Sequence, residues 1–142
     1  MNLSETDQML QEGYDLAGQV IGLAMKVHRT LGPGFLESVY HQSLRIELDR
    51  AAVEYETEKS LTVKYENVAV GEFKTDLIVD QQLIVEIKAV NNLVTAHEVQ
   101  LVNYLAATGI DEGLLLNFGS TSLEFRKKYR VYRRQQDSVV PF

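Results

Sequence analysis

The sequence predicts an α/β protein in which a mixed β-sheet is flanked by helices. Two N-terminal segments, residues 14–31 and 35–50, carry apolar residues at helical spacing. Two apolar runs within residues 71–88 are separated by a short polar turn, as in a hairpin. A helical segment at 95–108 then precedes a continuous apolar run at 114–116. A strand, a helix and a further buried strand in this order favour a right-handed crossover, which makes the sheet mixed.

The first two helices are predicted from Tyr14 to Leu31 and from Phe35 to about Arg50. Gly32, Pro33 and Gly34 separate them and are typical of a helix-to-helix turn. The apolar residues that define the two patterns are Leu16, Val20, Leu23, Ala24, Val27 and Leu31 in the first helix, and Leu36, Val39, Tyr40 and Leu44 in the second.

Strands follow these helices. The first is expected within Glu54–Tyr65, where apolar and polar residues alternate toward the end, and the hairpin of Gly71–Lys88 comes next. The run Leu114–Leu116 indicates a strand buried on both faces. Residues Leu123–Val131 predict a last, more exposed strand, at an edge of the sheet.

The third helix has sequence signals at both ends. Thr95, Ala96, His97 and Glu98 have the form of a capping box with Thr95 as the N-cap. Gly109 is the expected C-terminal stop, so the helix should end near Thr108.

Length and composition are those of one globular domain spanning residues 1–142, with loosely held termini at 1–13 and 135–142. Apolar residues make up 45% of the chain and charged residues 24%. The absence of cysteine excludes disulfides, thiolate metal sites and cysteine nucleophiles. No apolar run has the roughly 20 residues of a membrane helix and no signal sequence is evident, so a cytoplasmic protein without membrane contact is expected.

The formal net charge of −6 argues against a general polyanion binder. Six of the fourteen basic residues nevertheless lie within nine positions of the C-terminal part. They are Arg126, Lys127, Lys128, Arg130, Arg133 and Arg134. This run is compatible with a local patch that holds a nucleic-acid backbone, and equally with a solvated terminal strand and tail.

The hairpin places two acids and a lysine together. If its turn is centred on Gln81, residues whose numbers sum to 162 face each other, so Asp76 lies opposite Glu86. Glu86 and Lys88 share a strand face, about 7 Å apart. Opposed carboxylates have Cβ atoms roughly 5 Å apart and repel each other unless a cation lies between them.

Two carboxylates in this position are suitable ligands for Mg²⁺ or Mn²⁺, which prefer hard oxygen donors. Such a metal polarises a phosphoryl group and lowers the pKa of a bound water. Lys88 could orient or deprotonate that water, or stabilise charge on the phosphate. The pattern is short, and a solvated cross-strand ion pair explains it as well.

Two helices carry further candidates. Glu37, Tyr40 and His41 are neighbours on the second helix, and Glu37 could be a third ligand, directly or through water. An acid in a first helical turn also simply favours the helix dipole. Gln100 and Tyr104, one turn apart on the third helix, could contact phosphate or position the lysine, although Gln100 could equally satisfy backbone groups.

Taken together, these motifs resemble the family of GxxExxY proteins, from about Leu16 to Tyr129. The resemblance is carried by residues 31–40 (LGPGFLESVY), Asp76, residues 86–90 (EIKAV), residues 100–105 (QLVNYL) and the pair Thr108-Gly109. That family is placed in the PD-(D/E)XK nuclease superfamily. The proline that usually precedes the aspartate is replaced by Thr75.

The resemblance implies a restriction-endonuclease-like core of order α-βββ-α-β, here with an extra N-terminal helix and a C-terminal strand. It implies that Asp76 and Glu86 ligate Mg²⁺ or Mn²⁺ and that Lys88 is catalytic. Glu37 would be the acid from the preceding helix. Gln100 and Tyr104 would match the QxxxY element of the RecB-like branch.

The leading functional hypothesis is therefore a metal-dependent nuclease that hydrolyses phosphodiester bonds of DNA or RNA, with DNA favoured, by metal-activated water. The alternative is a non-catalytic module on a nuclease-like fold that binds nucleic acid or protein. Because the chain is acidic, we expect a homodimer or a protein partner to help hold the substrate.

Overall fold

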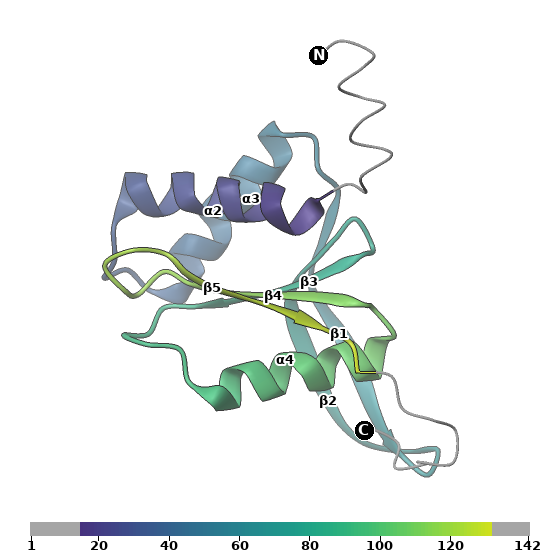
Figure 1. Cartoon of the computed structure of the whole chain (residues 1–142). Coiled ribbons are helices and arrows are strands. Elements are labelled where there is room, and N and C mark those ends of the chain that lie inside the picture. Colours follow the sequence, from purple (N-terminus) through teal and green to yellow (C-terminus); the bar gives the residue numbers. More distant parts are fainter. Residues whose placement is uncertain (1–14, 132–142) are drawn as a thin grey trace.

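The computed structural model describes residues 15–131 as three helices and five strands (Figure 1). Tyr14, the predicted start of the first helix, lies outside this range, as do the predicted loose termini 1–13 and 135–142. The helices are α2 (Leu16–Leu31), α3 (Glu37–Arg50) and α4 (Thr95–Thr108), and the strands are β1 (Tyr55–Tyr65), β2 (Val68–Val79), β3 (Leu83–Lys88), β4 (Glu112–Asn117) and β5 (Glu124–Tyr129).

The five strands form one mixed sheet in the order β1-β2-β3-β4-β5. All neighbours are antiparallel except β3 and β4, which are parallel and are connected through α4. The predicted α/β class, the crossover, the extra N-terminal helix and the C-terminal edge strand are all confirmed. Within the described residues no helix is long and apolar enough to cross a membrane.

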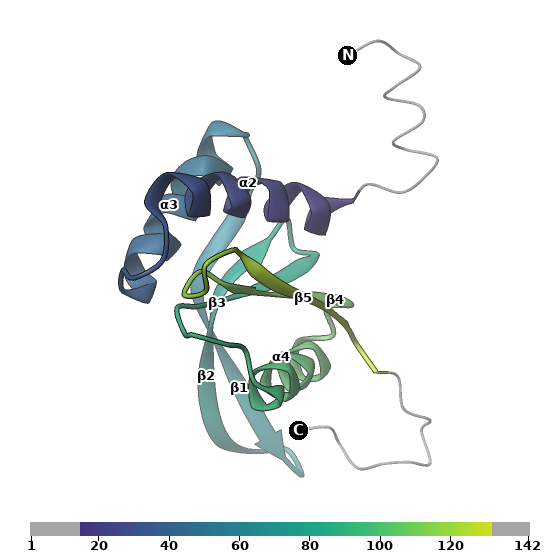
Figure 2. The ribbon, with the colours of Figure 1, turned by 60° about the vertical axis from the view of Figure 1, so that its left-hand side comes forward.

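Helices cover both faces of the sheet (Figure 2). On one face, α2 and α3 pack on a core that includes Val85 and Ile87 of β3. On the other face, Leu101 and Leu105 of α4 pack on Ile84 and on residues of the neighbouring strands. Because side chains alternate along a strand, Glu86 and Lys88 of β3 belong to the same face as Ile84, the face of α4.

Of the two predicted ends of α4, the C-terminal one is confirmed and the N-terminal one is wrong. Gly109 ends α4 in the left-handed conformation (φ 75°), as predicted, because a residue without Cβ adopts it readily. The prediction of Thr95 as N-cap is wrong: Val94 caps the helix and Thr95 is its first residue. The backbone N–H of Val94 donates to Nδ1 of His97 at 3.2 Å, so the imidazole supplies the acceptor expected from a capping side chain.

The β1–β2 hairpin is long, and its far part extends beyond the rest of the sheet (Figure 1). We call residues 60–73 the arm. Glu58 has φ of 49° and stands between the pairs Thr57–Leu77 and Lys59–Thr75. This irregular residue of β1 lies beside Asp76 on β2, so the regular ladder is interrupted next to the acids.

Candidate metal and phosphate site

The predicted hairpin register is confirmed over three residue pairs, Leu77–Val85, Ile78–Ile84 and Val79–Leu83. The numbers of each pair sum to 162. Asp80 and Gln81 in the turn both have positive φ, 50° and 59°, which is the geometry of a tight hairpin turn.

Beyond Leu77 and Val85, the two acids themselves join the strands. The backbone N–H of Asp76 donates to Oε1 of Glu86 at 3.3 Å. The backbone N–H of Ile87 donates to Oδ2 of Asp76 at 2.7 Å. The structure thus brings the two carboxyl groups together at the point where β2 and β3 separate.

Glu86 is an unusual acid because only 6% of its surface is exposed. Burial, the charge of Asp76 and a side-chain hydrogen bond with Asp76 raise its pKa from 4.5 to about 9. The hydrogen bond from the Asp76 backbone and the charge of Lys88 oppose this rise only partly. At neutral pH the Glu86 carboxyl group is therefore protonated unless a cation replaces the proton.

Lys88 ends β3 and is half-buried, and its charge lowers the pKa of both Glu86 and Glu37. Glu37 is the first residue of α3. Although Glu37 is exposed, partial desolvation and the charge of Asp76 raise its pKa, against smaller effects of Lys88 and His41. The four groups Glu37, Asp76, Glu86 and Lys88 thus influence one another electrostatically.

This arrangement is an open one. Among residues 15–131, no group of three or more His, Cys, Asp or Glu side chains gathers closely enough to hold a metal ion. Asp76 and Glu86 form a pair, and Glu37 approaches it from α3 without completing a closed cluster.

Tyr104 of α4 also reaches the acid pair. Burial, followed by the charges of Glu86 and Asp76, raises the pKa of its hydroxyl. Its ring stacks on Phe73 of β2 with centroids 4.0 Å apart and planes 5° from parallel. Gln100, one turn earlier, is exposed, and its side chain makes no hydrogen bond or ion pair with another residue between 15 and 131.

Two residues to which the sequence analysis gave no role support the site. His41 places Nε2 3.1 Å from the backbone oxygen of Asp76, which it can hold as a donor. In the sequence, the spacing of four residues between Glu37 and His41 was the one sign that His41 lies near the site. Asn117 is fully buried beside Lys88 in the β3–β4 ladder, and its carboxamide bonds both the N–H and the C=O of Val90. It thereby fixes the loop that follows Lys88.

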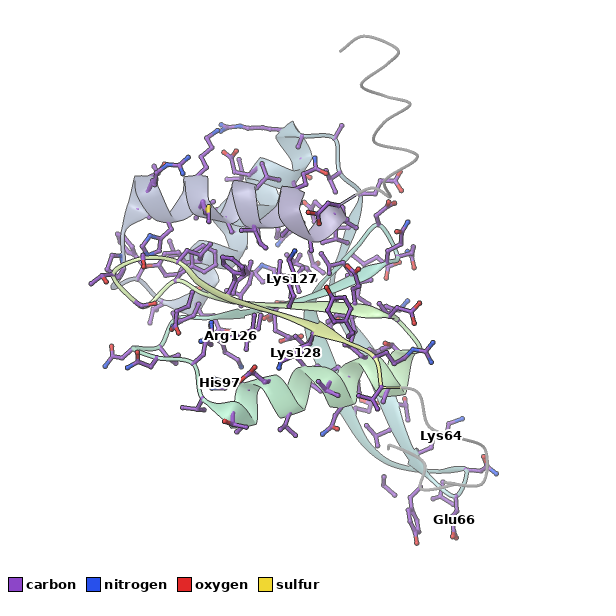
Figure 3. All side chains as sticks on the ribbon, viewed as in Figure 1. Lys64, Glu66, His97, Arg126, Lys127 and Lys128 are labelled. Atoms are coloured by element: carbon purple, nitrogen blue, oxygen red, sulfur yellow. The ribbon has the colours of Figure 1, made fainter. Side chains whose placement is uncertain are left out.

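The basic run lies partly along β5, where Arg126, Lys127 and Lys128 are labelled in Figure 3. Two of these cations are paired with acids: Lys128 Nζ lies 2.7 Å from Glu98, and an Arg126 nitrogen lies 3.6 Å from Glu124. Arg133 and Arg134 lie outside the described residues. The described part of the run is therefore largely neutralised rather than a bare cationic patch.

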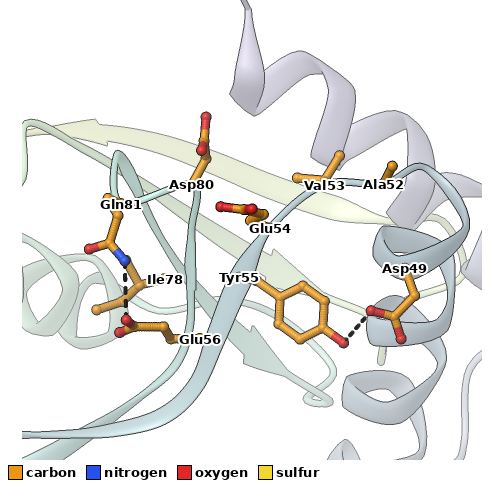
Figure 4. A pocket seen from close by; sticks show the side chains of 9 residues that line it. All are labelled: Asp49, Ala52, Val53, Glu54, Tyr55, Glu56, Ile78, Asp80 and Gln81. Carbon is orange, nitrogen blue, oxygen red and sulfur yellow. Dashed lines mark hydrogen bonds between the residues drawn. The ribbon is translucent and has the colours of Figure 1, made fainter.

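A larger cavity, of about 660 Å³, lies away from the acid pair, where the end of α3 meets β1 and the hairpin turn (Figure 4). Tyr55 donates to Asp49 at 2.7 Å beside it, and Gln81 donates to Glu56 at 3.1 Å. Its charged lining residues are all acidic, which makes it a poor site for a phosphate. None of the predicted site residues lines it.

Comparisons with known proteins agree with the fold. A family model described as the PD-(D/E)XK nuclease superfamily matches residues 14–130. The crystal structure of SSO0001 is similar, with a TM-score of 0.55 and 19% sequence identity, over 72% of this chain and 53% of that chain. The chain thus spans about half the length of that protein, and at this identity the likeness concerns the fold alone. No curated protein matches the sequence.

Proposed function

Because the chain belongs to the PD-(D/E)XK nuclease superfamily, we propose that it is a metal-dependent nuclease that hydrolyses phosphodiester bonds. The observation that carries this proposal is the acid pair, in which Glu86 is buried beside Asp76. The fold holds Glu86 beside Asp76 although the pKa of Glu86 rises to about 9 as a result. An arrangement that destabilises a carboxylate in this way is typical of a functional site.

The acid pair fits Mg²⁺ or Mn²⁺. Both ions prefer oxygen donors, and Mg²⁺ is usually bound by one or two carboxylates with several waters rather than by a closed protein cage. Asp76 and Glu86 would be the direct ligands, and Glu37 would contribute directly or through water. When bound, the cation would supply a Lewis acid that polarises the phosphoryl group and acidifies a water.

The other residues act around this centre. Lys88, on the same strand face as Glu86, orients the attacking water or stabilises charge on the phosphate. Tyr104 places its hydroxyl close enough to sense both acids and can contact the phosphate. Gln100 is exposed in the absence of substrate, so we assign it a contact with the bound strand.

We further propose that the chain is a GxxExxY protein of the RecB-like branch, since the QxxxY spacing of Gln100 and Tyr104 puts the tyrosine at the acids. A nuclease superfamily implies a nucleic-acid substrate, and we favour DNA over RNA.

A net charge of −6 and a largely neutralised β5 support a homodimer or protein partner that helps to hold the nucleic acid. We place this activity in the cytoplasm.

The same neutralised surface favours a second candidate, a non-catalytic module that binds nucleic acid or protein. The two functions differ in what they require of Lys88. A nuclease needs its ammonium group next to the acids, whereas a binding module does not.

The test is cleavage of labelled single-stranded and duplex DNA and RNA in Mg²⁺, in Mn²⁺ and in chelator. The variant is Lys88→Ala, and the matched control is Lys64→Ala, which removes an exposed lysine of the arm (Figure 3). A nuclease cuts only with metal, loses cutting in Lys88→Ala and keeps it in Lys64→Ala. Equal cutting by wild type and Lys88→Ala would reveal a contaminant. Absence of cutting in all proteins would favour the binding module.

A further inference from the structure

A second cavity, of about 290 Å³, lies between α4 and the arm, and we call it the arm groove. This volume is near the lower end of the roughly 300–1,000 Å³ of small-molecule pockets, so the groove suits one ring system rather than an extended ligand. Its principal lining residues are Val63, Val70, Phe73, Asn103, Tyr104 and Ala107.

Tyr104 links the arm groove with the acid pair. One part of this residue lines the groove, where its ring stacks on Phe73 at 4.0 Å. The same side chain is close enough to Glu86 and Asp76 to feel their charge. Phe73 also lies three residues before Asp76 on β2, about 10 Å along the strand, so a ligand in the groove lies near the acid site.

The polar groups of the groove favour a particular ligand. The carboxamide of Asn103 makes no hydrogen bond within residues 15–131, so it can donate and accept. Glu72 lines the groove and adds an acceptor, while none of the lining residues is a lysine or arginine. A phosphate is repelled by such a lining. A flat, uncharged ring with hydrogen-bonding edges fits it.

We propose that the arm groove binds an unpaired base of the nucleic-acid strand whose phosphate lies at the Asp76–Glu86 pair. This inference rests on the proposed nuclease function and specifies its substrate. Unstacked bases are recognised by aromatic side chains that stack on them and by polar groups at their edges. Phe73 and Tyr104 already stack on each other, so a base adds to an outer face or an edge of this pair, and Asn103 with Glu72 supply the polar groups. A base inside a duplex is already stacked and paired, so the substrate is a single strand or a frayed end.

Gly71 offers a way to block the groove without touching the aromatic pair. It lines the groove, opposite Val63 in the β1–β2 ladder, and a Cβ built on it meets no atom within 4 Å. Gly71→Leu therefore fits the backbone and fills part of the space for a base. Thr62→Leu is the matched control, since Thr62 is an exposed arm residue that does not line the groove.

The experiment measures binding rather than cleavage. Fluorescence anisotropy follows end-labelled oligodeoxythymidylate, the same oligomer with abasic residues, and a blunt duplex, in Mn²⁺. All proteins carry Lys88→Ala so that the probes stay intact. Circular dichroism melts check that Gly71→Leu and Thr62→Leu are folded, and calorimetry checks that they still bind Mn²⁺.

The proposal predicts that the single strand binds roughly 5- to 150-fold more tightly than the abasic strand, the range expected for stacking of one base. Gly71→Leu should remove this preference, and Thr62→Leu should keep it. Equal binding of both strands, an unchanged preference in Gly71→Leu, or no binding of any probe would overturn the proposal. A base preference without cleavage by the protein that retains Lys88 would refute the nuclease function while leaving the groove as a base site.

Discussion

Replacing Glu86 with glutamine should make the metal-free protein more stable at neutral pH. In the wild type the folded state raises the pKa of Glu86 from 4.5 to about 9. An acid whose pKa is raised in the folded state does not lower the free energy of unfolding at a pH below its pKa in the unfolded chain. The free energy of unfolding then falls as the pH rises toward the pKa in the folded state. The affected window therefore runs from about pH 4.5 to about pH 9.

The size of the change in the free energy of unfolding follows from the width of that pH window. Each pH unit between the two pKa values corresponds to about 1.4 kcal/mol. At pH 7 the free energy of unfolding is thus lower, by on the order of 3 kcal/mol, than for a chain with a neutral side chain at this position. Glutamine is neutral and nearly isosteric, so Glu86→Gln should recover most of this amount at pH 7 and little at pH 5.

The assay is urea unfolding in chelator at pH 5, 6, 7 and 8, with the free energy of unfolding compared between wild type and variant. Glu66→Gln is the control, because Glu66 is an exposed acid at the tip of the arm (Figure 3). Its difference from wild type should stay near zero at every pH. A Glu86→Gln protein that is no more stable than wild type at pH 8, or a difference that does not grow with pH, would refute the reasoning.

Two further substitutions probe the packing that positions the site. Gly113→Ala should destabilise the protein by about 1–3 kcal/mol in thermal melts, since the added Cβ would lie 2.8 Å from Cδ1 of the fully buried Leu101; an unchanged melting temperature would contradict this. Asn117→Ala should cost on the order of 2–4 kcal/mol because it leaves the N–H and C=O of Val90 without their partner. The same variant should lower cleavage by loosening the loop after Lys88, and wild-type stability would contradict this role.

Much of the fold could be predicted because local and periodic signals agree with it. The polar turn at Gln81 set the register of the hairpin over three residue pairs. The next pair in that register would be Asp76 and Glu86, and their side chains make the contact there. Gly109 acted as a helix stop because a left-handed residue without Cβ is needed there. In these cases one short stretch of sequence determines the geometry.

Other features depend on contacts that sequence spacing does not contain. The capping prediction at Thr95 went wrong by one residue because His97 supplies the acceptor from inside the helix. The stacking of Tyr104 on Phe73 depends on how closely the arm approaches α4. In the sequence, Asn117 is only the end of a predicted strand. Its bonds to the loop after Lys88 depend on the pairing of β4 with β3.

The pKa of Glu86 likewise comes from tertiary burial rather than from the pattern of acids. The sequence predicted repulsion between two carboxylates, and the structure adds that one of them is almost completely buried. Because of this burial, the Glu86 carboxyl group keeps its proton at neutral pH.

The most direct test of the account is calorimetric titration of Mn²⁺ into the wild type at pH 7, in buffers of different ionisation enthalpy. If Asp76 and Glu86 bind the ion, the proton on Glu86 must leave, so about one proton should be released per ion bound. Asp76→Asn should abolish or greatly weaken binding. Tight binding without proton release, or equal binding by Asp76→Asn, would contradict the claim that Asp76 and the buried Glu86 form the metal site.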